Sequence, residues 1–487
     1  MSSMAKAEGK KPMSYWIHAL ICVAFMFGFG FLPPLGGEIT PLGMRVLGVF
    51  IGLFYGWIFL EFTWPSLLGL VALGITDYST IGGAFVEGLK NDTTINILLM
   101  FIFSAYLEKT GALKWVTYWI ISRKALVGRP WLFTVVFIAA IMPLAVFVNV
   151  FAGIIMMWAM FYTVCEVVGL EKKDMYVSYV IFGIANLGAF LQIAFPWQPL
   201  SLAIFKLAGP ANGITEIPFG AWTLFGLGMC TIFPLMYYIL GKFVLRIDVS
   251  KMAAMGDQFA EYRGIKMNAE QKFGIGLLAF FILMIVLPTY TTGSVKAFLS
   301  NFGIQGTAIL CIVIAFLYQL WNGGSFYSFG NMVRDGVNWD LLILFIVTFP
   351  ISTALESGDA GVINTVINMI MPVVNSLSPL LFLTVVCVIF CMVTQVSHNL
   401  VLMIALIPSL AKIAASIGFN PFVFGLVFAL ACQVAVSTPA ASAATAMVFG
   451  NTEWVEKGYA YKIGVVTLVF WLAAALAIMI PFTMLIF

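Results

Sequence analysis

Long apolar stretches separated by short polar turns run through almost the whole chain. A membrane-spanning helix needs about 20 consecutive apolar residues, and most of these stretches are close to that length, so the pattern predicts about eleven transmembrane helices. The expected fold is an all-α polytopic membrane protein. The spans are predicted over residues 15–33, 44–60, 62–77, 94–108, 176–205, 221–243, 273–290, 304–321, 341–355, 421–449 and 463–487.

Two further apolar segments, 131–168 and 378–416, each carry a short, poorly helical interruption that contains an Asn. The interruptions lie at Asn149 and at His398-Asn399. The arms around them look too short for two full crossings, so we predict two re-entrant hairpins. Non-helical backbone at membrane depth is tolerated only where it is buried in protein or lines a cavity. Two such tips therefore predict a central site reached from opposite sides, which is the plan of a transporter.

Two of the predicted spans contain helix-breaking sequences. Pro196-Trp197-Gln198-Pro199 lies inside 176–205, where proline removes a backbone donor and clashes with the preceding turn. We therefore expect that helix to break near Pro196. In 421–449 the expected break is the segment from Ser437 to Ser442.

The two halves of the chain repeat the same order of landmarks. Leu107-Glu108 corresponds to Leu355-Glu356, Asn149 to Asn399 and Phe205 to Phe449, all at an offset of about 250 residues. An odd number of crossings separates the copies, which predicts an inverted structural repeat typical of secondary transporters. The expected organisation is scaffold helices in 1–93, a first repeat core in 94–220, scaffold helices with a cytoplasmic linker (242–272) in 221–340, a second repeat core in 341–462, and a last helix in 463–487.

The distribution of positive charge predicts the orientation. Cytoplasmic loops are enriched in Lys and Arg, and with the N-terminus inside about four in five of the 24 such residues fall on the inner side. This bias holds only if the two hairpins do not cross the membrane. We predict a cytoplasmic N-terminus, a C-terminus outside, and a location in the plasma (cytoplasmic) membrane. An aromatic, basic stretch from Trp115 to Lys124 is expected to be an interfacial helix.

The amino-acid composition and the missing motifs limit the possible classes of protein. The chain is 62% hydrophobic and 9% charged, far from the roughly one quarter of charged residues in soluble proteins. The first apolar run lacks a small-residue cleavage site and is expected to be a retained span. All seven Cys fall in apolar segments without CxxC spacing, so we expect buried packing residues. No phosphate-binding loop or zinc-protease motif is present, so we predict neither a pump nor an enzyme, and no nucleic-acid partner.

Several motifs resemble the divalent anion/sodium symporter family of the ion-transporter superfamily. Leu107-Glu108-Lys109-Thr110-Gly111 is similar to the segment after that family's fourth span, and the run from Trp339 to Phe345 is similar to its counterpart in the second half. Ser437-Thr438-Pro439, followed by the run from Ala446 to Gly450, resembles the family's second broken helix. The resemblance implies sodium-coupled symport of a small organic anion, such as a di- or tricarboxylate, by an elevator-type movement, usually in a homodimer.

The hairpin tips depart from that family's Ser-Asn-Thr pattern. The corresponding residues are Val148-Asn149-Val150 and His398-Asn399-Leu400, so both Asn are kept while the flanking hydroxyls are lost. These departures leave the substrate and the ion sites open.

An anion at membrane depth needs hydrogen-bond donors, yet no Lys or Arg falls in the middle of a span or at a tip. The donors must then be polar side chains and backbone N–H groups at the N-termini of half-helices. Capping or packing is the alternative role for these side chains. The expected substrate-binding residues are Asn149, Val150, Pro196, Trp197, Gln198, Ser397, His398, Asn399, Thr438 and Pro439.

A co-transported sodium ion is predicted to bind to oxygen atoms freed at the tips and breaks. The second half offers several hydroxyls, whereas a first-half site would rest mainly on carbonyls, with Asn186 and Gln192 as helpers. The side chains expected to contribute are Asn149, Asn186, Ser397, Asn399, Ser437, Thr438 and Ser442.

Other interpretations of the same fold stay open. A proton-coupled permease or sodium/proton antiporter would need a titratable group at depth, and His398 is the one candidate, with a structural role equally open. Glu61, Glu108 and Glu356 lie at predicted span ends, where solvation or capping is expected. The chain could also be the membrane subunit of a binding-protein-dependent transporter. A channel is the least favoured interpretation, because two opposed tips imply alternating access.

Overall fold

A computed structural model of the chain describes residues 11–147, 150–210, 213–253, 260, 263–321, 328–374 and 377–487. Within these ranges the regular elements are helices, with no β-strand. The predicted all-α membrane architecture is therefore confirmed. By length and composition, ten helices in the described ranges could cross a membrane, or eleven if a bent pair is counted as one span.

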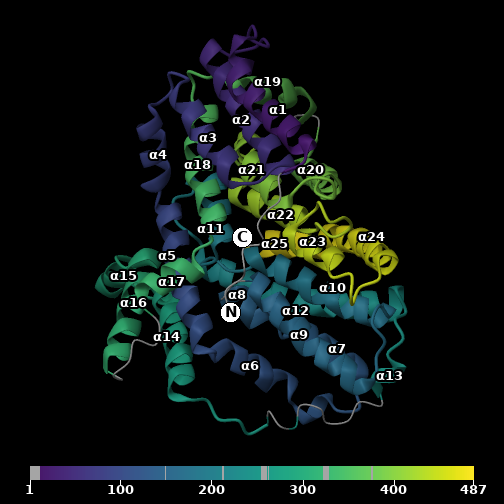
Figure 1. The fold of residues 1–487 in the computed structure, drawn as a ribbon. Coiled ribbons are helices and arrows are strands. Elements are labelled where there is room, and N and C mark those ends of the chain that lie inside the picture. The colour runs from purple at the N-terminus through teal and green to yellow at the C-terminus, as the bar shows by residue number, and fades with distance from the viewer. Residues whose placement is uncertain are drawn as a thin grey trace.

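The helices of the two halves follow one another in a matching order (Figure 1). The first half contains α1 (Met13–Gly28), α2 (Pro41–Phe59), α3 (Thr63–Gly74), α4 (Ile81–Leu89), α5 (Asp92–Thr110), α6 (Ala112–Ile121), α7 (Pro130–Ala139), α8 (Met142–Phe147), α9 (Val150–Val168), α10 (Met175–Phe190), α11 (Pro199–Ala208) and α12 (Phe219–Ile239). The short α13 (Ser250–Ala253) lies in the linker. The second half contains α14 (Ala269–Val286), α15 (Gly293–Ser300), α16 (Gly303–Trp321), α17 (Phe329–Gly336), α18 (Trp339–Glu356), α19 (Val362–Val374), α20 (Pro379–Val393), α21 (Asn399–Ser416), α22 (Pro421–Gln433), α23 (Ala443–Gly450), α24 (Lys457–Ala474) and α25 (Ile480–Ile486).

Most predicted spans form helices where expected, and both broken helices are confirmed. The α10 helix ends at Phe190, continues as a 3-10 turn over Leu191–Ile193, and the chain becomes α-helical again at Pro199. In the second half α22 ends at Gln433 and α23 begins at Ala443. Each break lies between a half-helix that ends and one that begins.

The prediction of a full span over 62–77 was wrong. The α3 helix has 12 residues and is about 18 Å long, which is too short to cross a bilayer. A side chain on Gly74 would overlap the backbone of Ile81, so the chain turns tightly there and α4 packs back on α3. The connection between the predicted spans 62–77 and 94–108 therefore contains the helix α4.

The hairpin arms are longer than predicted. Pro130–Phe147 and Asn399–Ser416 have 18 residues each and are long enough to cross a membrane. A short turn at Ala140 and Ile141 separates α7 from α8 in the first arm, with Pro143 in the first turn of α8, and α21 of the second hairpin continues through Pro408. Arm length alone therefore does not establish re-entrance, which stays a prediction. One observation supports re-entrance of the second hairpin. The α22 helix has 13 residues and is about 20 Å long, so it ends inside the bilayer. The second tip bonds to the break that follows α22, and so lies at the same depth.

Matched capping residues start the corresponding helices of the two halves. Asn91 begins α5 by accepting from Thr93 N at 3.0 Å, and Asn338 begins α18 by accepting from Leu341 N at 3.1 Å. Asp174 caps α10 in the same way that Asn420 caps α22. Each pair lies about 245 residues apart, as expected for duplicated units.

Helices of each half pack against the opposite half in a reciprocal way. The first-half helix α5 contacts α14, α16 and α17, and the second-half helix α18 contacts α2, α3 and α4. Likewise α11 contacts α22, and α23 contacts α10. Figure 1 shows α14 to α17 gathered beside α5, and α2 to α4 beside α18. Such exchanged contacts are those of two copies related by a pseudo-two-fold axis.

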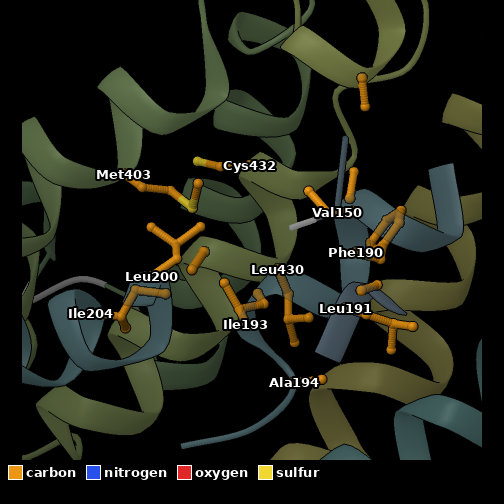
Figure 2. Close-up of a cluster of buried hydrophobic side chains, with 14 of the residues drawn as sticks. Val150, Phe190, Leu191, Ile193, Ala194, Leu200, Ile204, Met403, Leu430 and Cys432 are labelled. Atoms are coloured by element: carbon orange, nitrogen blue, oxygen red, sulfur yellow. The ribbon is translucent and has the colours of Figure 1, made fainter. Parts of the chain in front are cut away.

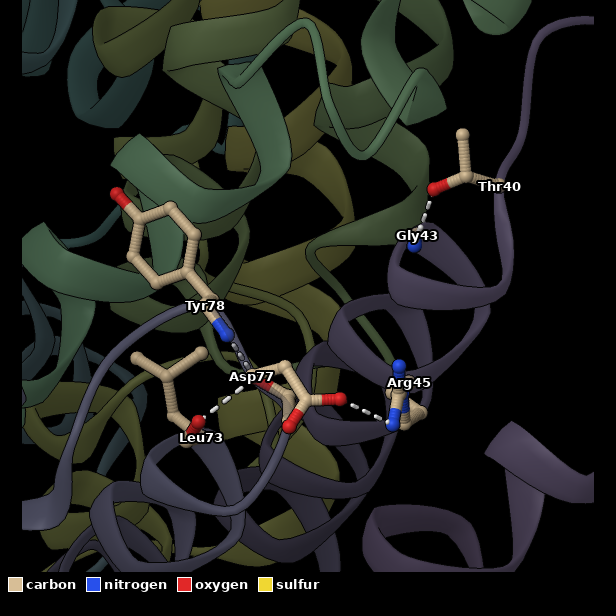
Figure 3. A network of polar contacts seen from close by, with 7 residues as sticks. Thr40, Gly43, Arg45, Leu73, Asp77 and Tyr78 are labelled. Carbon is tan, nitrogen blue, oxygen red and sulfur yellow. Dashed lines mark hydrogen bonds and ion pairs between the residues drawn. The ribbon is translucent and has the colours of Figure 1, made fainter.

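The polar residues around the start of α2 join it to neighbouring turns (Figure 3). Thr40 accepts from Gly43 N at 3.1 Å and donates to Asp359 O at 2.6 Å. Arg45 forms an ion pair with Asp77 at 2.8 Å in the turn between α3 and α4. Because the Asp77 side chain is largely exposed, this pair contributes little to stability.

The α5 and α6 helices meet at an angle. Gly111 adopts a left-handed backbone conformation (φ 66°) between them, and the two axes differ by 58°. This bend agrees with the predicted interfacial helix, whose membrane position stays a prediction. All seven Cys are free thiols, and all are buried except the half-buried Cys230, as expected for packing residues.

Two glycines make close reciprocal contacts between the halves. A side chain on Gly88 of α4 would overlap the carbonyl group of Ile346 in α18. A side chain on Gly336 of α17 would overlap Ala105 in α5 and approach Phe101 O to 2.9 Å. The two helix pairs are therefore held at a separation that only glycine permits.

We expect Gly88→Ala and Gly336→Ala each to lower the free energy of unfolding by about 1–3 kcal/mol, because the helices must move apart. Gly82 and Gly330 occupy the same two helices, and no atom lies within 4 Å of the place that a side-chain carbon would take there. Gly82→Ala and Gly330→Ala are thus matched controls and should be neutral or stabilising by up to about 1 kcal/mol. Thermal unfolding in detergent would measure all four; equal effects within each helix would contradict the close packing.

Candidate functional site

A cavity of about 220 Å³ lies beside the first hairpin. Its walls come from α5, from the described ends of α8 and α9, from the break between α10 and α11, and from the turn between α17 and α18. The cavity is therefore enclosed by residues of both halves. The predicted tip residue Asn149 lies outside the described residues.

The first turns of two helices border this cavity. Pro199 and Leu200 begin α11, and Asn338 is the N-cap of α18. Val150 and Phe151, the first described residues after the tip, also line it. The N-terminus of a helix carries a partial positive charge and free backbone N–H groups. This arrangement favours an anion without any positively charged side chain.

Trp197 offers a side-chain donor at the same cavity. Its ring stacks against Phe147 and Phe195, with centroid distances of 5.8 and 4.9 Å, and only 2% of the residue is exposed. The indole Nε1 is buried and has no hydrogen-bond partner among the described residues. A buried donor usually has a partner, so an acceptor on a ligand would satisfy it.

Gln198 joins the helix break to the hairpin. Its Oε1 accepts from Phe195 N at 2.8 Å, and its Nε2 donates to Ala145 O at 3.3 Å. The predicted site residue Gln192 also lines the cavity, whereas Pro196 lies in the break without lining it. Gln198 thus positions the break against α8.

The charged groups at the cavity are both acidic. Glu108 of α5 and Asp335 of α17 line it, and its lining contains no Lys, Arg or His within the described part of the chain. The sequence predicts Glu108 at a solvated span end, and it does not indicate Asp335, Asn338 or Ser104 as site residues. An N-cap Asn before an apolar run could have indicated Asn338, but nothing in the sequence places α17 beside the first hairpin.

The second hairpin tip packs into the break between α22 and α23. Asn399 N donates to Ala441 O at 2.9 Å, and the Asn399 side chain donates to Gln433. Gln433 Nε2 in turn donates to Ala189 O of α10 at 2.7 Å, which links this tip to the first half. Ser397 Oγ and His398 Nδ1 are buried without a hydrogen-bond partner among the described residues, and the His398 ring lies edge-on to Phe62 at 5.3 Å.

Three of the hydroxyls predicted as sodium ligands in the second half already donate hydrogen bonds. Ser437 Oγ donates to Gln395 Oε1 at 2.9 Å, and Thr438 Oγ1 donates to Gln395 O. Ser442 Oγ donates to Ala435 O at 3.1 Å and to Thr445 Oγ1 at 2.9 Å. The bonds to Gln395 hold the tip against the break.

The structure brings the predicted residues together in two groups. Val150, Trp197 and Gln198 line the first cavity. Ser397, His398, Asn399, Thr438 and Pro439 belong to the second tip and its break and do not line that cavity. An apolar cluster drawn from both halves, including Val150, Ile193, Leu200, Met403 and Leu430, fills the region where the two breaks approach (Figure 2).

Asn186 does not join either group. It lies in the helical part of α10 and lines a separate small cavity with Phe233 of α12 and Trp471 of α24. Asn186 lies apart from the break because it precedes the end of α10 by about one helical turn. At that position on the helix it faces α12 and α24. The structure therefore places it apart from the first cavity, and its part in a first-half sodium site stays a prediction.

Comparison with known families gives one match. Residues 46–432 match the CitMHS family model, which is described as a citrate transporter and covers both hairpins and most of the chain. No curated protein sequence matches the chain. The more specific resemblance to divalent anion/sodium symporters remains a resemblance.

The first cavity should be open to water-soluble reagents. In a Cys230→Ser background, we expect Ser104→Cys and Gln192→Cys to react with a membrane-impermeant methanethiosulfonate, because both positions line the cavity. Thr348→Cys on α18 is a matched control, since Thr348 is buried away from it. Mass spectrometry of the intact protein would count the modified thiols; protection of both cavity positions, as for Thr348→Cys, would contradict an open cavity.

Proposed function

The chain belongs to the CitMHS citrate transporter family, and on that premise we propose that it carries citrate or a related tricarboxylate by secondary active transport, with the cavity at the first hairpin as its binding site. The observation that supports this site is the meeting of two helix N-termini, those of α11 and α18, with the indole N–H of Trp197, which has no partner among the described residues. Carboxylate oxygens accept hydrogen bonds from such donors.

The charge of the cavity indicates that the anion does not travel alone. Two unit charges of the same sign about 4 Å apart repel by about 4 kcal/mol at an effective dielectric constant near 20. Asp335 is paired with Arg334 at 2.8 Å, so the repulsion falls mainly on Glu108. A polycarboxylate beside Glu108 therefore needs co-bound cations. Such cations would make anion binding and cation binding cooperative, because each lowers the electrostatic cost of the other.

We propose sodium as the coupling ion, in line with the expectation from sequence. The side-chain oxygen atoms at the first cavity include the amides of Gln192 and Gln198 and the carboxylate of Glu108. The acidic lining supports binding of a hard cation beside the substrate.

An elevator-type movement is proposed for the transport cycle. The contacts between helices support this movement. The second hairpin (α20 and α21) and the half-helices α10, α11, α22 and α23 are linked by contacts into one connected body. This body would move past the remaining helices and carry the substrate with it. The homodimer, suggested by the resemblance, is proposed as the assembly.

Proton coupling is a second candidate function, and one observation favours it. Such coupling needs a carboxyl group at the site, and Glu108, although exposed, lines the cavity. A neutral, protonated Glu108 would remove one repulsive charge when the substrate binds.

The experiment that tests the function is uptake of labelled citrate into proteoliposomes under an inward sodium gradient, an inward proton gradient, or neither. Citrate chelates divalent cations, so each condition is run with and without added Mg²⁺. Uptake driven by sodium supports the proposal, and uptake driven only by protons supports the second candidate. Absence of uptake by folded protein under every gradient would overturn both.

Trp197→Phe keeps the stacked ring and removes the indole N–H. A hydrogen bond to a charged group contributes about 1.5–3 kcal/mol, so we expect the KM for citrate to rise roughly 10- to 100-fold. Trp471→Phe is the matched control, because Trp471 also has a buried N–H without a partner among the described residues but lines a different cavity. An unchanged KM in Trp197→Phe would remove Trp197 from the binding site.

Glu108→Gln separates the two coupling candidates. If a proton is carried on Glu108, the variant should lose uptake driven by a pH gradient while still exchanging internal for external citrate. With sodium coupling, the variant should instead require a higher sodium concentration for half-maximal uptake. Glu356→Gln, the matched position in the second half, does not line this cavity and serves as the control.

A further inference from the structure

Gln395 is buried at the second tip and makes five hydrogen bonds through its side-chain amide. Nε2 donates to Cys391 O at 2.7 Å and to Val434 O at 2.5 Å. Oε1 accepts from Val436 N at 3.1 Å, and from Ser437 N and Ser437 Oγ at 2.9 Å each. The side chain therefore uses its full hydrogen-bonding capacity between the hairpin and the break.

The two carbonyls that Gln395 satisfies belong to the C-terminal ends of two half-helices. Cys391 lies in the last turn of α20, and Val434 is the C-cap residue of α22. Such ends carry a partial negative charge and unpaired carbonyl oxygens. Two of them meeting at a hairpin tip form the electrostatic environment that attracts a cation in membrane transporters.

We propose that the Gln395 amide takes the place of a coupling cation in the second half, so that cation coupling is confined to the first-half cavity. The N–H groups of the amide satisfy the two helix ends as a cation would, without carrying a charge. The inference rests on the proposed cation-coupled transport and identifies where the coupling ion binds. It also explains why the predicted ligands Ser437 and Thr438 turn toward Gln395.

The first half is not closed in the same way. Among the described residues, Gln198 makes one bond to the hairpin, to Ala145 O at 3.3 Å. A cavity lined by Glu108 and by Asp335, which pairs with Arg334, lies beside it. The two halves therefore differ although their helices correspond. One retains space and negative charge for a cation, while the other is filled by an amide.

Removing the amide should create a requirement for a cation. In detergent, we expect Gln395→Ala to unfold several degrees below the wild type in choline chloride, and we expect sodium chloride to restore more of the melting temperature in the variant than it adds to the wild type. Gln319→Ala is the matched control, since Gln319 is similarly buried but lies in α16, outside both hairpins and both breaks, and its loss should not be restored by sodium.

An equal response of Gln395→Ala and the wild type to sodium would overturn the proposal. If Gln395→Ala does not fold, Gln395→Glu provides the test, because a carboxylate cannot donate to Cys391 O and Val434 O and adds negative charge between them. That variant should be markedly more stable in sodium than in choline, and equal stability in the two salts would also refute the proposal. Neither measurement uses citrate, so a failure of citrate uptake would overturn the proposed function separately.

Discussion

The structure depends on satisfying the backbone groups that helix breaks expose inside a membrane. A carbonyl or N–H left unpaired in hydrocarbon costs several kcal/mol, so a broken helix persists only beside a partner that completes its hydrogen bonds. In the second half the hairpin residue Gln395 bonds to the break, and in the first half Gln198 of the break bonds to the hairpin. The same requirement places polar groups and helix ends at one depth, where a solute can bind.

Reciprocal packing joins the two halves. The α5 helix packs on helices of the second half and α18 on helices of the first, so each half is held by contacts with the other. Gly88 and Gly336 have no side chain, so α4 approaches α18 closely and α17 approaches α5 closely. Close packing of this kind gives the van der Waals attraction that drives helix association in lipid. The α10 helix, 94% buried, lies at the centre, while α1, 11% buried, lies at the periphery.

Duplication produced similar helices but different sites. At the first hairpin a cavity combines two helix N-termini, those of α11 and α18, with the side chains of Glu108 and Asp335, so partial positive charge and carboxylates lie at one place. At the second hairpin the corresponding space is closed by side chains, with Asn399, Gln433 and Ala189 joined in one chain of hydrogen bonds. The asymmetry follows from a few side chains, since the backbone plan is shared.

The sequence by itself determined the membrane class, the order of the helices, both helix breaks and the repeat, because apolar length, proline and capping residues act locally. It did not determine that 62–77 forms a short helix and a tight turn, that Asn186 faces α12 and α24, or that Asp335 and Asn338 reach the first hairpin. Those features depend on contacts between segments far apart in the chain. Only the tertiary structure decides which side chains share a cavity, because packing of one half against the other sets the register of each helix.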